Sequence, residues 1–139
     1  MNSLPATVGD FYRYVVGVDT HAATHSYAII KAPNGGLIDQ NVFPTSPAGL
    51  RRARDWISRR TEGDLDDVLI AAEGTGSYGA VLSDVLQQAG YRVVEAPTPR
   101  RARARSKTDA LDAMLAARSS LVMPLTKLRD GTAARIGDI

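Results

Sequence analysis

The stretch YVVGVDTH, from Tyr14 to His21, decides the fold that this sequence predicts. Its first five residues are apolar or glycine and valine predominates, which favours a strand that is buried on both faces. The run ends at Asp19. Ligands of open α/β sheets gather beyond such strand ends, so Asp19 is a candidate binding residue. A solvated acid that starts a turn is the alternative interpretation of this one residue.

Two more strands follow directly, over residues 26–31 and 37–43, on either side of the turn sequence PNGG. A helix is expected from Pro47, because Ser46 is a favourable N-cap and proline is favourable at the first helical position. Beyond it the pattern predicts alternating strands and helices, with strands at 68–72 and 91–95 and helices at 78–89 and 108–121.

The predicted order of elements is therefore β-β-β-α-β-α-β-α. Three antiparallel strands followed by helix-linked strands are typical of the ribonuclease H-like fold, an α/β fold in which helices flank a mixed five-stranded sheet. The last two strands are joined by a helix, so they are expected to be parallel. In this arrangement the first and fourth strands are neighbours at the centre of the sheet.

The length of 139 residues suits one domain with a substantial core. We expect a flexible leader over 1–13, the catalytic domain over 14–124, and in 125–139 the start of a linker or helix toward a further C-terminal domain. The absence of cysteine excludes disulfides, thiolate zinc sites and a cysteine nucleophile. There is no signal-peptide pattern and no apolar run of transmembrane length, which predicts a cytoplasmic protein without membrane contact.

The formal net charge of +2 is unevenly distributed. Residues 97–107 carry five cations and no acid, which leaves −3 for the rest of the chain. A concentrated basic strip on a mildly acidic body favours local contact with a polyanion, whereas a solvated charge run is the alternative. The predicted nucleic-acid-binding residues of this strip are Arg100, Arg101, Arg103, Arg105 and Lys107.

Three further acids stand at positions that the fold brings toward Asp19. Glu73 ends the fourth strand and precedes a glycine-rich turn, for which a plain strand-to-helix connection is an equally good local interpretation. Asp109 and Asp112 are three positions apart on the last helix and so share a face. A helix cap explains Asp109 alone, but not both acids.

Carboxylates that converge raise one another's pKa unless a cation holds them. Phosphoryl transfer on DNA uses such a group, because two divalent ions about 3.5–4 Å apart neutralise the charge on the attacking and leaving oxygens. Asp and Glu oxygens are suitable ligands for Mg²⁺ or Mn²⁺. The sequence therefore predicts a carboxylate site for two such ions, with the basic strip against the phosphodiester backbone and with His21, Ser77 and Tyr78 as secondary candidates.

Three motifs in order, GVDTH at 17–21, EGTGSYG at 73–79 and KTDALDA at 107–113, resemble the DEDD transposases of bacterial insertion sequences. The resemblance spans about Val15 to Leu121. It implies the fold of the Holliday-junction resolvases and a DNA transposase or recombinase activity that mobilises an insertion sequence. It also implies which four residues form the catalytic, metal-binding tetrad: Asp19, Glu73, Asp109 and Asp112.

Members of this family are also known as bridge-RNA-guided recombinases, so the expected partners are DNA, a guide RNA and further copies of the full-length chain. Full-length members carry a C-terminal domain with a serine, and Ser119 and Ser120 do not match its motif. The alternatives are a stand-alone nuclease of the junction-resolvase type, an ATP-binding domain related to sugar kinases and actin, and a nucleic-acid-binding fragment without activity. The ATP-binding alternative is disfavoured because the segment after Asp19 lacks a glycine-rich phosphate loop.

Overall fold

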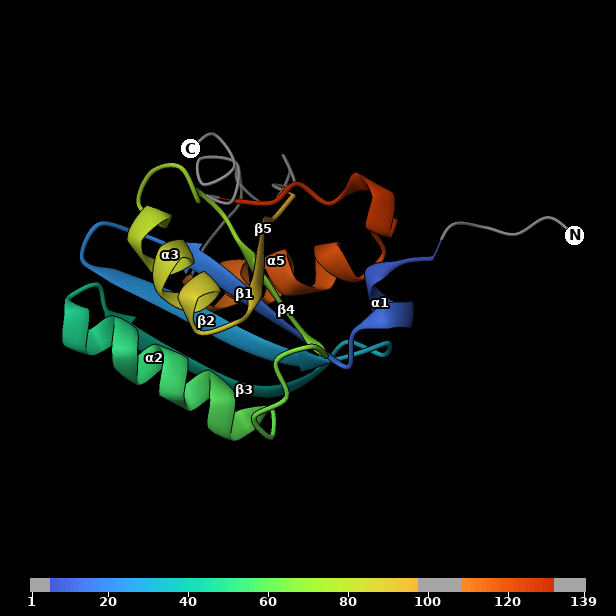
Figure 1. Ribbon diagram of the computed structural model, residues 1–139, viewed down its shortest axis with the longest axis horizontal. Helices are drawn as coiled ribbons and strands as arrows, with labels where there is room; N and C mark the ends of the chain where they lie inside the picture. Colours follow the sequence, from blue (N-terminus) through green and yellow to red (C-terminus); the bar gives the residue numbers. More distant parts are fainter. Residues whose placement is uncertain (1–5, 98–108, 132–139) are drawn as a thin grey trace, which may run out of the picture.

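A mixed five-stranded sheet is the centre of the computed structural model, which describes residues 6–97 and 109–131 (Figure 1). The strand order is β3-β2-β1-β4-β5. β1 pairs with β2, and β2 with β3, in antiparallel register, whereas β4 runs parallel to both β1 and β5. The predicted meander, the central pairing of the first and fourth strands and the parallel last pair are all confirmed.

The bounds of the elements follow the sequence patterns to within a few residues. The strands are β1 (Tyr14–Thr20), β2 (Thr24–Lys31), β3 (Gly36–Pro44), β4 (Val68–Ala72) and β5 (Arg92–Glu95). The helices are α1 (Val8–Phe11), α2 (Pro47–Arg60), α3 (Ala80–Gln88) and α5 (Asp109–Leu121), followed by a 3-10 turn at Leu125–Lys127. At the start of α2, the Ser46 side chain accepts a hydrogen bond from the Gly49 amide, as its N-cap position predicts. No helix among these described segments is long and apolar enough to cross a membrane.

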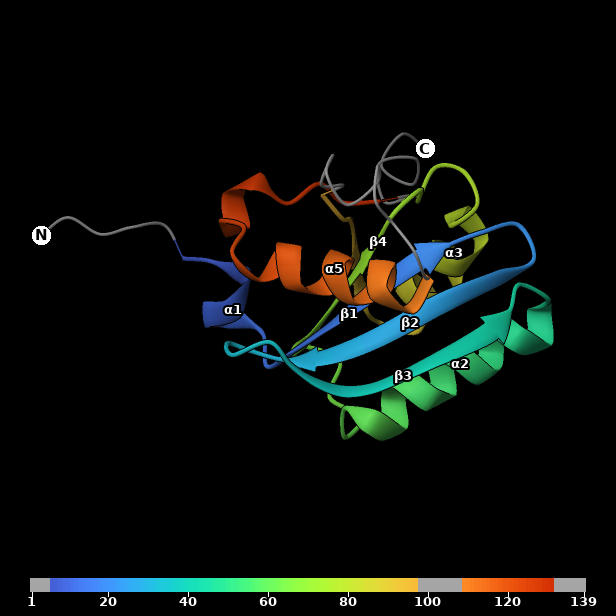
Figure 2. The same cartoon turned by 180° about the vertical axis from the view of Figure 1, so that it is seen from behind.

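Helices cover both faces of the sheet (Figures 1 and 2). On one face, α2 and α3 pack over Val16, Val18 and their neighbours, with Trp56 and Ile57 buried from α2. On the other face, α1 and α5 pack over Val15 and Ile30. Successive residues of a strand point to opposite faces, so Gly17 and Asp19 face the same side as Val15, toward α5.

The contact between α5 and β1 depends on small residues. A Cβ atom on Gly17 would overlap the carbonyl oxygen of Ala113 and would lie 2.5 Å from the amide nitrogen of Ala117. The buried face of α5 consists mainly of alanines, so the helix backbone approaches the sheet closely. The prediction that Leu111, Met114 and Leu115 point inward is therefore wrong: Leu111 is exposed and the other two are only half-buried.

Both ends of the described chain pack on the domain. Within the expected leader, α1 places Val8 and Tyr12 in the core beneath α5. After α5, Leu125 and Leu128 pack against the same core, and Asp130 forms a bridge with Val94 of β5. The apolar side chains of these two segments are thus removed from water against the core, which stabilises the packing of both segments.

An ion pair on the edge strand β3 makes the stability of the fold depend on pH. On β3, the Asp39 carboxylate accepts hydrogen bonds from Arg60 Nε at 2.8 Å and from the buried Trp56 Nε1 at 3.2 Å. The bond from Arg60, more than any other contact, holds the pKa of Asp39 below its ordinary value of 3.8. A lowered pKa means that the folded state binds the proton more weakly than the unfolded state. The ionised carboxylate therefore stabilises the fold above that value, and the stabilisation is lost as pH falls through the folded pKa.

We expect Asp39→Asn to lower the free energy of unfolding by about 1 kcal/mol at neutral pH, because Asp39 is partly solvated and loses a charge-assisted contact. The difference from wild type should shrink as pH falls below 3.8. Urea denaturation at neutral pH and at a pH below 3.8 measures this difference in the free energy of unfolding. The exposed Asp66→Asn variant is the control. A difference that stays constant with pH would show that the ion pair does not contribute.

Candidate active site

Asp19 lies at the end of β1 on the α5 side of the sheet, and only 6% of its surface is exposed. Its backbone pairs with Ser26 of β2. Burial raises the pKa of Asp19, a contact with His21 partly offsets that effect, and the negative charges of Asp112 and Asp109 raise the pKa further. Burial and the neighbouring acids disfavour the ionised form of Asp19, so a positive charge placed beside it would stabilise that form.

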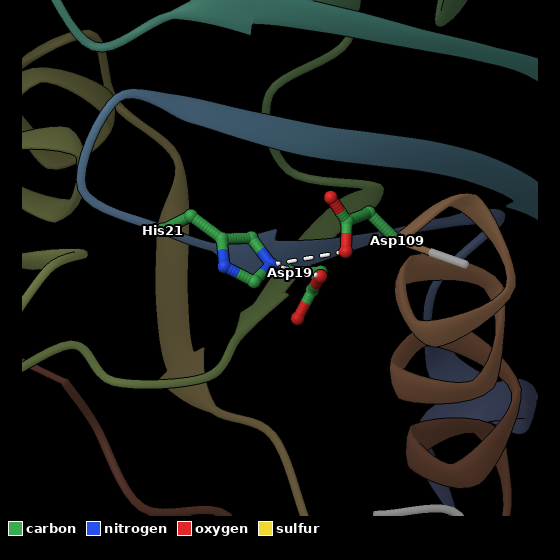
Figure 3. A group of neighbouring side chains, drawn as sticks. All are labelled: Asp19, His21 and Asp109. Atoms are coloured by element: carbon green, nitrogen blue, oxygen red, sulfur yellow. Dashed lines mark hydrogen bonds and ion pairs between the residues drawn. The ribbon is translucent and has the colours of Figure 1, made fainter. Parts of the chain in front are cut away.

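His21 lies between two carboxylates (Figure 3). Its Nε2 atom is 2.7 Å from Asp19 Oδ2 and 3.2 Å from Asp109 Oδ1. The hydrogen bond with Asp19 is the main cause that raises the pKa of His21. The His21 amide donates to Nδ1 of His25, which is buried, and burial lowers the pKa of His25. His25 therefore fixes the backbone that carries His21.

Asp109 and Asp112 lie in the first turn of α5, where acids are favourable beside the helix N-terminus. The Asp109 side chain is 55% exposed and contacts His21. Asp112 is half-buried, and its negative charge contributes to the raised pKa of Asp19. The close approach of α5 to β1 at Gly17 is what brings this turn next to the end of β1.

Glu73 directly follows β4, and its backbone is tied to the end of β1. The Glu73 amide donates to the Val18 carbonyl at 3.2 Å, and the Thr20 hydroxyl donates to the Glu73 carbonyl at 2.8 Å. Gly74 then turns the chain with φ +69°, a conformation that favours glycine. Val18 and Thr20, the residues on either side of Asp19, thus hold the Glu73 backbone at the same end of the sheet as Asp19.

Glu95, at the end of β5, holds the turn that follows Glu73. One carboxylate oxygen accepts from the Gly74 amide at 2.8 Å, and the other accepts from the Thr75 amide at 3.0 Å and the Thr75 hydroxyl at 2.7 Å. Sequence reasoning missed this residue. The signal was present, because Glu95 is an acid at the end of an apolar strand, the same pattern that identified Asp19 and Glu73.

Glu95→Gln tests this positioning role. The substitution replaces one acceptor oxygen by an amide donor that faces backbone N–H donors, so the turn should loosen. We expect hydrogen exchange at Gly74 and Thr75 to accelerate and Mn²⁺ affinity to fall about 10–100-fold, the usual effect of losing an outer partner of a metal site. Exchange measured by NMR and calorimetric titration check both effects.

Glu62→Gln makes the same chemical change at an exposed position and should leave both quantities unchanged. Unaltered exchange at Gly74 and Thr75 in Glu95→Gln would show that the carboxylate does not hold the turn.

The other predicted residues fall into two groups. The basic strip of Arg100, Arg101, Arg103, Arg105 and Lys107 lies outside the described residues. Among the remaining candidates, Tyr78 is exposed in the turn before α3, and Ser77 donates to the Gly74 carbonyl at 3.3 Å. Arg118 donates to the Gly35 carbonyl at 3.0 Å, on the α5 side of the sheet.

Asp19, His21 and Asp109 form the Asp–His–Asp group, in which one ligand atom from each residue lies within 4.8 Å of the others. The donor set is two carboxylate oxygens and one imidazole nitrogen. Carboxylate oxygens suit hard divalent cations, and imidazole is compatible with Mn²⁺. The carboxylates of Asp19 and Asp109, which both lie beside His21, also attract a cation to this point. The residues present therefore fit a divalent metal ion.

Comparison with known proteins identifies the family and the fold. A family model of DEDD type, described as transposase, matches residues 16–134. No curated protein matches the chain. Among solved structures, RuvC of Thermus thermophilus is similar with a TM-score of 0.57 and 14% sequence identity, over 84% of this chain and 99% of that one.

A second structure, T. thermophilus RuvC in complex with a Holliday junction substrate, gives a TM-score of 0.53 at 14% identity, over 82% of this chain and 100% of that one. At this identity the likeness concerns the fold, which is ribonuclease H-like, as the order of elements predicted. The family model covers most of the chain, and the chain therefore belongs to the DEDD transposase family.

Proposed function

We propose that this chain is the catalytic domain of a DNA transposase or recombinase that carries out metal-dependent phosphoryl transfer. The observation that carries the proposal is the convergence of Asp19 and Asp109 on one point at the sheet edge, in a chain of the transposase family. The two residues are distant in the sequence. Two carboxylates that lie close together without a cation repel each other. The close approach of Asp19 and Asp109 therefore favours a functional site that accepts a cation.

Asp19 and Asp109 would hold the metal, with Glu73 and Asp112 completing the tetrad at the same edge. We propose Mg²⁺ or Mn²⁺, with two ions per site. When bound, such ions supply charge neutralisation on the phosphate and a more acidic bound water. Without an ion, the His21 imidazole can hold a proton between the carboxylates of Asp19 and Asp109.

Other residues of the chain orient the side chains of the proposed site. Thr20 and Glu95 fix the backbone on either side of Glu73, and His25 fixes that of His21. Precise placement of reacting groups accounts for a large part of enzymatic rate enhancement. The basic strip from Arg100 to Lys107 is proposed to bind the phosphate backbone, which positions DNA without reading its sequence. A guide RNA, self-association of the full-length chain and a cytoplasmic location belong to the same proposal.

A second candidate is a stand-alone, junction-selective nuclease. The observation in its favour is that this chain alone covers nearly the whole of T. thermophilus RuvC, one structure of which holds a Holliday junction. The chemistry at the metal would be the same. The two candidates differ in the DNA they select and in whether cut ends are joined to a second DNA.

A cleavage assay tests both candidates. The protein is incubated with a labelled four-way junction, or with a linear duplex of the same sequence, in Mg²⁺, in Mn²⁺ or in chelator. We expect phosphodiester cleavage in either metal and none in chelator. Preference for the junction without strand joining would favour the nuclease, and joined products would favour the recombinase. Binding of DNA without cleavage under every condition would contradict both.

A further inference from the structure

A groove of about 550 Å³ between α2 and α3 lies outside the Asp–His–Asp group. Its walls combine apolar and cationic side chains, the most relevant being Leu50, Arg51, Arg54, Val81 and Val85. Val81 is 63% exposed and presents an apolar side chain to the groove. The volume is in the range of small-ligand sites, about 300–1,000 Å³.

One end of the groove, at Thr45 and Pro47, lies at the same end of the sheet as the carboxylates, on the face opposite α5. β1, β3 and β4 run in one direction, so Asp19, the start of α2 and the start of α3 all lie at their carboxyl ends. Thr45 lines the groove, and its hydroxyl donates to the Ala22 carbonyl at 2.9 Å. Ala22 follows His21 directly, so the groove rim and the active-site loop are in contact.

The chemistry of the walls indicates an anionic occupant with an apolar face. Arg51 is exposed, and Arg54 forms an ion pair with its exposed neighbour Asp55, at 3.1 Å. An exposed ion pair of this kind is weak, so a phosphate can compete for the guanidinium. Apolar side chains offer a surface to a base or sugar.

We propose that the α2–α3 groove binds single-stranded nucleic acid, with phosphates on Arg51 and Arg54 and a base or sugar against Val81 and Val85. This inference rests on the proposed function, because it supplies a path for an unpaired strand that leaves the catalytic edge of the sheet. Single-strand-binding surfaces share with this groove the cationic side chains that follow the phosphates, and here aliphatic side chains take the place of aromatic platforms beside the bases. An unpaired strand of DNA and a guide RNA share this chemistry.

The test is binding of labelled oligodeoxythymidine or oligouridine, about 12 nucleotides long, within the usual site sizes. Chelator is present, so that binding is independent of the catalytic metal. The Arg51→Ala/Arg54→Ala variant should lower the slope of log affinity against log salt by about 1.4, at about 0.7 per lost single-strand phosphate contact. At a tenth molar salt this is a loss of roughly 20-fold. Val81→Glu should weaken binding of the oligonucleotides more than binding of a duplex.

Arg52→Ala/Arg59→Ala is the matched control, because it removes the same charge from the same helix at exposed positions that do not line the groove. Its slope should equal that of wild type, and thermal melting should show that all variants are folded. Tighter binding of one oligonucleotide identifies DNA or RNA as the source of the strand.

Equal losses in the two double variants would overturn the groove site and leave only a basic helix surface. A groove variant that changes the oligomeric state in light scattering, but not the salt slope, would assign the groove to a second copy instead. If wild type binds none of the oligonucleotides, duplex or junction, the proposed function itself fails. Normal binding and cleavage by the Arg51→Ala/Arg54→Ala variant would remove this inference alone.

Discussion

Asp19→Asn is expected to reduce metal-dependent DNA cleavage by more than about a hundredfold. The substitution keeps the shape of the side chain but removes the most buried charge of the site. Loss of an outer partner of a metal site alone costs about 10–100-fold, and loss of a ligand should cost more. The rate is measured by single-turnover cleavage of a labelled junction in saturating Mn²⁺.

The free energy of unfolding separates this effect from misfolding. In chelator, burial disfavours the ionised Asp19, so the Asn variant should be at least as stable as wild type. Asp66→Asn, an exposed acid far along the chain, should change neither cleavage nor stability. Cleavage by Asp19→Asn at the wild-type rate would show that Asp19 is not a ligand.

Gly17→Val is expected to have the largest effect on folding. Any side chain at position 17 meets the backbone of α5 at Ala113 and Ala117, which cannot move like the end of a flexible side chain. Overpacking of a core costs about 1–3 kcal/mol, and contact with two backbone atoms of α5 places valine at the upper end or beyond. Displacement of α5 also separates Asp109 from Asp19, so Mn²⁺ binding should weaken as well.

Denaturant unfolding and Mn²⁺ titration measure the two effects in Gly17→Val and in the milder Gly17→Ala. Gly36→Ala is the control, because a Cβ atom there has no neighbour within 4 Å. If Gly17→Val were as stable as Gly36→Ala, the close contact of α5 with β1 would not be needed for the fold.

The sequence was sufficient for the order of elements because its signals are local. Runs such as residues 14–18 and 68–72 are apolar throughout, and glycine or proline separates them from the helices. The pairing of β1 with β4 followed from the fold class, and it was enough to place Asp19 beside Glu73. Helix periodicity likewise placed Asp109 and Asp112 on one face of α5.

What the sequence could not supply depends on contacts between distant elements. The inward face of α5 consists of alanines because Gly17 lets the helix approach, and neither feature is informative alone. The bridging position of His21 depends on the path of the β1–β2 loop and on its contact with His25. Val8 and Tyr12 are buried only because α1 folds back under α5, a contact that no local pattern predicts.

The proposed metal site is tested most directly by paramagnetic broadening in a Mn²⁺ titration of isotope-labelled protein. We expect the amide signals of Thr20, Gly74 and Ala110 to broaden first in wild type, because these residues adjoin Asp19, Glu73 and Asp109. In Asp19→Asn the same amides should need much more Mn²⁺ to broaden, whereas Asp66→Asn should behave like wild type. Identical broadening in wild type and Asp19→Asn, or broadening that begins elsewhere in the domain, would contradict a carboxylate metal site at the end of β1.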